Sequence, residues 1–175
     1  MAARPESRLE VVHSLDPRDT ATIYQDGIVA GVLGAAAVAL WFLILDTIGG
    51  RPFYTPTVLG TALFRRGADL NAPGGLPISL EMVGMFTWVH TLVFVAIGGI
   101  ASRLLAIAEK NPSFGFGVLL LFVMFQAGFT VAAMLLAAPI VGLLGWPAVL
   151  AANLIAAGAM AAYLWSRHRT LTVAP

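Results

Sequence analysis

The sequence predicts an all-α integral membrane protein, a four-helix bundle with a short interfacial helix in its first loop. The first observation is composition: 59% of the 175 residues are hydrophobic and 11% are charged, whereas soluble domains are about 25% charged. The second observation is a set of long uncharged runs, and the third is the prolines and glycines that divide them. These observations exclude a disordered chain and an ordinary soluble globule.

The absence of cysteine and the balance of charge exclude further classes of protein. A chain without cysteine has no disulfide, thiolate metal site, iron–sulfur cluster or cysteine nucleophile. Lys and Arg number 10 against 9 Asp and Glu, so the net charge of +1 offers no surplus for a polyanion. We therefore expect a lipid bilayer around the chain and no nucleic-acid partner.

Three uncharged runs define the membrane spans. A span needs about 20 mostly apolar residues, and the runs 27–45 and 82–102 have 19 and 21 residues without Asp, Glu, Lys or Arg. The run 111–166 has 56 residues without Asp, Glu, Lys, Arg or His, and Pro139 and Pro147 divide it in two. The prediction is a transmembrane domain 23–166 with helices at about 23–48, 79–109, 114–138 and 147–166.

Local signals predict where these helices begin and end. Gly49 and Gly50 should end the first helix. Ser79 is a good N-cap for the second, with Glu81 in the first turn, where the helix dipole favours an anion. Pro147 suits the first position of the fourth helix, because an N–H is not needed there.

The distribution of basic residues predicts the orientation in the membrane. The tail 1–22, the end of the second helix with the loop that follows it, and the tail 167–175 together hold seven Lys and Arg residues. The outer loop 49–78 holds three, and the final hairpin holds none. Basic residues gather on the cytoplasmic side of membrane proteins. Both tails are therefore predicted to be cytoplasmic in a multi-pass protein.

The outer loop contains the signals of a short interfacial helix. Thr55 is a candidate N-cap, and Pro56 suits the first helical position. Arg65 and Arg66 would complement the dipole in the last turn, and Gly67 would adopt the left-handed cap. The apolar stripe that we expect to dock at the membrane interface consists of Val58, Leu59, Ala62 and Leu63.

Three polar side chains fall inside the predicted spans. His90 lies nine residues beyond Glu81, or about 13 Å deeper. Gln126 is near the middle of the third helix, and Asn153 is in the outer part of the fourth. Such groups usually face the bundle interior. The simplest interpretation is a neutral His90 that hydrogen-bonds one of these amides or Thr91 and so joins the helices.

The same residues support two alternatives. His90, Gln126 and Asn153 would together line a pocket of a small transporter or a ligand-binding membrane protein. His90 would otherwise bind a haem iron, but bis-histidine ligation would then require a second histidine from a dimer or a partner. We predict no cofactor.

Polar residues also gather at the predicted outer boundary. Asp46 and Glu81 lie at helix ends, where solvation or pairing with the loop arginines is the simplest interpretation, and the spacing of Asp46 and Arg51 suggests one pair. The alternative is an enzyme site around these residues and Tyr54. No catalytic motif or metal motif of known spacing is present. We therefore expect no enzyme, no catalytic residue and no metal site.

Small residues mark surfaces for helix packing, because they let helix backbones approach closely within a membrane. Two such surfaces favour contacts with other membrane subunits or with a second copy of the chain. The alternative is that both surfaces pack on each other inside one chain. They consist of Gly27, Gly31 and Gly34 on the first helix and of Ala148, Ala152 and Ala156 on the fourth.

Four stretches between residues 41 and 98 together form one pattern. They read Trp-Phe-Leu-Ile-Leu-Asp at 41–46, Gly-Arg-Pro-Phe-Tyr-Thr-Pro-Thr-Val-Leu-Gly at 50–60, Trp-Val-His-Thr at 88–91 and Phe-Val-Ala-Ile-Gly at 94–98. This pattern resembles a group of small, uncharacterised four-span bacterial inner-membrane proteins without an assigned activity. The resemblance covers the first two helices and their loop, and it implies a bacterial inner membrane.

The functional prediction follows from packing surfaces without catalytic motifs. We expect a non-enzymatic accessory or scaffold subunit of a larger bacterial membrane complex, for which an energy-converting complex is one candidate. The alternative is the small transporter or ligand-binding protein with its pocket near His90, Gln126 and Asn153. Purification from native membrane distinguishes them, because the first prediction requires other subunits to co-migrate.

Overall fold

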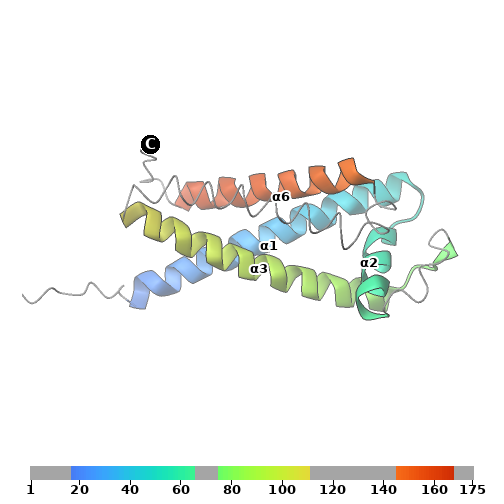
Figure 1. The fold of residues 1–175 in the computed structure, drawn as a ribbon, viewed down its shortest axis with the longest axis horizontal. Coiled ribbons are helices and arrows are strands. Elements are labelled where there is room, and N and C mark those ends of the chain that lie inside the picture. Colours follow the sequence, from blue (N-terminus) through green and yellow to red (C-terminus); the bar gives the residue numbers. More distant parts are fainter. Residues whose placement is uncertain (1–16, 66–74, 111–144, 168–175) are drawn as a thin grey trace, which may run out of the picture.

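A computed structural model describes residues 17–65, 75–110 and 145–167, and no strand occurs among them. Three of the described helices are long and apolar enough to cross a membrane, and they lie side by side while a short helix packs at one end (Figure 1). The all-α prediction is confirmed for these residues, whereas the predicted span 114–138 lies outside them. The helices are α1 (Pro17–Ile48), α2 (Tyr54–Phe64), α3 (Leu80–Lys110) and α6 (Trp146–Arg167).

Helix α1 runs antiparallel to both α3 and α6. Ser102, near the end of α3, bonds Ile23 near the start of α1, and the Trp41 indole N–H near the end of α1 donates to the Ala148 carbonyl at the start of α6 at 3.0 Å. Helices α3 and α6 therefore run in the same direction.

The beginning of α1 differs from the prediction, and its end agrees with it. The helix starts at Pro17 rather than near residue 23, because the fixed φ of proline suits the first turn of a helix. Part of the predicted tail 1–22 is therefore helical. Beyond Ile48, Gly50 has a φ of 71°, and the Arg51 N–H donates to the Asp46 carbonyl at 2.8 Å.

Glycines on α1 allow α3 to approach at backbone distance. A Cβ placed on Gly27 would lie 2.6 Å from the Cα of Gly99, and one on Gly31 would lie 2.5 Å from the Cα of Val95. Real side chains do not fit at these distances, so a larger residue would separate the helices. The α1 surface predicted from its small residues is thus filled by a helix of the same chain.

Helix α6 packs on the neighbouring face of α1. Gly34 makes room for the Met160 side chain, whose Sδ would lie 2.6 Å from a Cβ at position 34. The inner face of α6 follows an i, i+4 spacing, so one stripe of the helix is covered. This stripe consists of Ala152, Ala156, Met160 and Leu164, all buried.

Helix α2 forms where predicted, but it has different ends. Phe53 is the N-cap, with a left-handed φ of 66°, and Thr55 is the second helical residue rather than the cap. The reason is that Asp46 of α1 supplies the acceptor that a capping side chain would otherwise provide. The helix ends at Phe64, so Arg65 follows the last turn. Arg66 and Gly67 lie outside the described residues.

The face of α2 that is buried within the chain is its threonine side, and the stripe predicted to dock at the membrane interface stays a prediction. Val58 is fully buried, but Leu63 is 54% exposed. Gly60 contacts the Met82 backbone of α3, where a Cβ would lie 3.0 Å from the carbonyl carbon. This backbone contact decides which face turns inward. The buried residues are Thr55, Thr57, Val58, Gly60 and Thr61.

Candidate functional site

The C-terminal end of α1 contains a buried carboxylate that caps α2. The two oxygens of Asp46 accept hydrogen bonds from the Thr55 N–H and the Thr55 hydroxyl, both at 2.7 Å. Asp46 is only 8% exposed. An anion is favourable at this position because the first N–H groups of a helix lack partners within the helix and the dipole is positive there.

Arg51 lies beside this cap and joins the two ends of the outer loop. Its guanidinium carbon lies 4.0 Å from the centre of the Tyr54 ring, within the range of a cation–π interaction. Its Nη2 donates to the Leu76 carbonyl at 2.9 Å. Arg51 and Tyr54 therefore fasten α2 to the segment that leads into α3.

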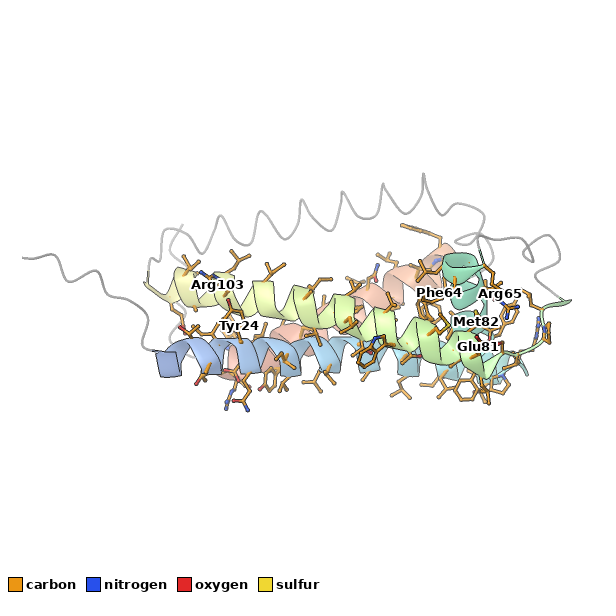
Figure 2. All side chains as sticks on the ribbon, turned by 90° about the horizontal axis from the view of Figure 1, so that it is seen from below. Tyr24, Phe64, Arg65, Glu81, Met82 and Arg103 are labelled. Carbon is orange, nitrogen blue, oxygen red and sulfur yellow. The ribbon has the colours of Figure 1, made fainter. Side chains whose placement is uncertain are left out.

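Glu81 is in the first turn of α3, as predicted, and forms an ion pair with Arg65. The distance between the Arg65 Nη2 and the Glu81 Oε2 is 3.8 Å, and the side chains are 51% and 69% exposed. Figure 2 shows the two side chains at the α2 end of the molecule. Ser79 precedes this turn and accepts the Met82 N–H at 3.4 Å, so its predicted role as N-cap is confirmed.

The opposite end of α1 contains a second buried carboxylate, which the sequence reasoning missed. Asp26 is 5% exposed. Its Oδ1 accepts hydrogen bonds from the Tyr163 hydroxyl at 3.1 Å and from the Arg167 Nε at 2.9 Å. The available signal was the i, i+4 spacing of Tyr163 and Arg167, which places both donors on one face of the last helix.

Helix α3 is attached to the same end of α1 by two further hydrogen bonds. Ser102 is fully buried, and its hydroxyl donates to the Ile23 carbonyl at 2.7 Å. The Nη1 of Arg103 donates to the Tyr24 hydroxyl at 2.9 Å. All three long helices are therefore joined by polar contacts where α1 begins.

His90 lies between these ends, on α3. Its ring centre is 5.4 Å from that of Phe86 and 4.7 Å from that of Phe94. Its Nε2 is buried and has no hydrogen-bond partner in the described part of the chain. The residue thus packs among aromatic side chains and leaves one ring nitrogen unsatisfied.

The predicted partners of His90 do not bond it where the structure describes them. The Thr91 hydroxyl donates to the Thr87 carbonyl of its own helix at 2.8 Å. Asn153 is half-buried on α6, and it does not hydrogen-bond the Nε2 of His90. Gln126 lies outside the described residues.

The described residues contain no group of three or more His, Asp or Glu side chains that could hold a metal ion. No protein-family model, curated protein or solved structure matches the chain. The resemblance to small four-span bacterial proteins and the inner-membrane location that it implies therefore stay predictions.

Proposed function

We propose that the chain is a non-enzymatic accessory or scaffold subunit of a larger membrane complex. One observation carries this proposal: α6 has two faces rich in small residues, and among the described residues only one of these faces is packed against another helix. The inner face contains Ala152 and Ala156. The outer face is exposed and consists of Leu154, Gly158, Ala161, Ala162 and Trp165.

The outer face of α6 has the chemistry of a helix–helix contact in lipid. Its residues share one side of the helix, with a flat centre at Gly158, Ala161 and Ala162 between the larger Leu154 and Trp165. A Cβ at Gly158 would meet no atom within 4 Å. Lipid chains gain little from a flat face, whereas another helix backbone can approach it and gain dispersion contacts.

The other small-residue surface does not add to this argument. Gly27 and Gly31 contact α3, and Gly34 accommodates Met160, so the α1 surface is occupied inside the chain. One free face supports a subunit that docks by a single helix. The proposed setting is a bacterial inner membrane with both termini cytoplasmic, and an energy-converting complex is one candidate host.

The polar contacts support a structural role. Asp26 and Asp46 are the buried carboxylates of the described residues. Each accepts hydrogen bonds from a neighbouring helix, and each therefore holds two helices together. The supposed enzyme site at the outer boundary is better explained as the attachment of α2.

The test is the same substitution on the free face and on a control surface. Gly158→Leu should lower recovery of partner subunits from native membranes roughly tenfold, which corresponds to about 1.4 kcal/mol. Gly84→Leu is the control, because Gly84 is exposed on α3 and a Cβ there also meets no atom within 4 Å. Equal recovery for both variants, or a wild-type chain that purifies alone, would refute the proposal.

A second candidate function rests on the unsatisfied Nε2 of His90. Buried polar groups usually have partners, so a polar ligand or a haem iron at this nitrogen would explain it. The chain would then be the small transporter or ligand-binding protein, with Gln126 and Asn153 as further pocket residues. A bound molecule or a visible haem absorption band that disappears in His90→Leu would favour this candidate.

A further inference from the structure

An apolar groove of about 300 Å³ lies between α1 and α3, near the start of α1. Its sides include Ile28 of α1 and Val95 and Ile100 of α3, and Ile28 and Ile100 are 49% and 61% exposed. Gly99 also lines it, and a Cβ at this position would meet no atom within 4 Å. The groove thus exists partly because residue 99 has no side chain.

One end of the groove is polar. Tyr24 and Arg103 line it, and Figure 2 shows their side chains together where α1 and α3 meet. The Arg103 guanidinium donates to the Tyr24 hydroxyl at 2.9 Å. This bond uses one of the five N–H groups of arginine and leaves the tyrosine proton able to donate elsewhere. Among the described residues, no carboxylate pairs with Arg103.

The dimensions of the groove match one leaflet of a bilayer. The α3 residues that line it extend from Val95 to Arg103, about 12 Å along the helix axis. Half of the hydrocarbon thickness is about 15 Å. An acyl chain in the groove would therefore lie within one leaflet, with its headgroup beside Arg103.

We propose that this groove binds an anionic phospholipid of the cytoplasmic leaflet. One acyl chain lies against Ile28, Val95, Gly99 and Ile100, and the phosphate accepts hydrogen bonds from Arg103 and Tyr24. Charge complementarity selects this occupant, because basic pockets between membrane helices on the cytoplasmic side suit anionic headgroups. The inference uses the predicted orientation, which places Arg103 on that side, and it is independent of the α6 interface.

The test is native mass spectrometry of the full chain in mild detergent with phosphatidylglycerol or phosphatidylcholine. We expect the wild type to retain phosphatidylglycerol at least roughly fivefold more than phosphatidylcholine. This ratio is on the order of the discrimination that one charged hydrogen bond gives. Arg103→Gln should abolish this preference, and Gly99→Leu should lower binding of both lipids by filling the groove. Arg65→Gln removes the same charge at the opposite end and should bind as the wild type does.

Two further variants keep the test decisive. Tyr24→Phe preserves the ring and should reduce phosphatidylglycerol retention less than Arg103→Gln does, while Arg103→Lys should preserve part of the preference. The proposal is overturned if Arg103→Gln and Arg65→Gln lower retention equally, because the effect would then follow net charge alone. It is also overturned if Gly99→Leu leaves retention unchanged, because the lipid would then lie elsewhere.

Discussion

The two ends of α1 each contain a buried carboxylate, but the carboxylates act at different ranges along the chain. Asp46 and Asp26 are 8% and 5% exposed. Asp46 bonds Thr55, only nine residues away, through neutral donors. Asp26 bonds Arg167, 141 residues away, through a charged donor. The first contact shapes a local turn, whereas the second joins distant helices of the bundle.

The surroundings of the partners also differ, and this determines the expected cost of losing each contact. The Arg167 side chain is 51% exposed, so water can solvate it if Asp26 is changed. The two Thr55 bonds to Asp46 are buried, so the donors would lose their acceptor without gaining water. A buried donor without an acceptor costs the full desolvation penalty. The end with the uncharged partners should therefore be the more sensitive one.

The largest effect is expected for Asp46→Ala. The change removes both acceptors of Thr55 and should lower the free energy of unfolding in detergent by an amount on the order of 3 kcal/mol. Hydrogen exchange should increase across 54–64, because α2 loses its cap. Asp46→Asn, which keeps one acceptor, should lower the free energy of unfolding by less. Unchanged exchange in Asp46→Ala would contradict the capping role.

A smaller loss is expected for Asp26→Asn. The amide oxygen still accepts a bond from Tyr163 or Arg167, so the free energy of unfolding should fall by about 1 kcal/mol. Added salt should narrow the gap to the wild type, because salt screens the half-exposed pair with Arg167. Denaturation at low and high salt provides the measurement. If Asp26→Asn lowered the free energy of unfolding by more than Asp46→Ala does, the comparison between the two ends of α1 would be reversed.

The smallest effect is expected for Arg65→Gln. Its ion pair with Glu81 spans 3.8 Å between two exposed side chains, and such pairs contribute about 0–1 kcal/mol. The midpoint of thermal unfolding should therefore move by no more than a few degrees. A loss of stability equal to that of Asp46→Ala would mean that the pair with α3 holds α2 as strongly as the cap on α1 does.

Sequence reasoning predicted local features well, because their causes are neighbouring residues. The end of α1 follows from Gly50, and the start of α3 follows from Ser79. The contact of Asp26 with Arg167 was missed because a hydropathy pattern does not reveal which faces of two distant helices meet.

The orientation of α2 shows the same limit at shorter range. Apolar periodicity selected a stripe containing Leu59 and Leu63, whereas the contact between Gly60 and Met82 turns the threonine side inward. The surface predicted from Gly27 and Gly31 is a real packing surface, but its partner is α3 of the same chain. Small residues therefore predict close approach without identifying the helix that approaches.

The central proposal is that the two ends of α1 lie on opposite sides of a membrane, with α2 outside. The chain contains no cysteine, so single cysteines at the exposed positions Gly75 and Ser166 can be labelled without background. An impermeant thiol reagent on intact cells should label Gly75→Cys at once, and it should label Ser166→Cys only after the membrane is opened. Labelling of Ser166→Cys in intact cells, with Gly75→Cys protected, would contradict the account.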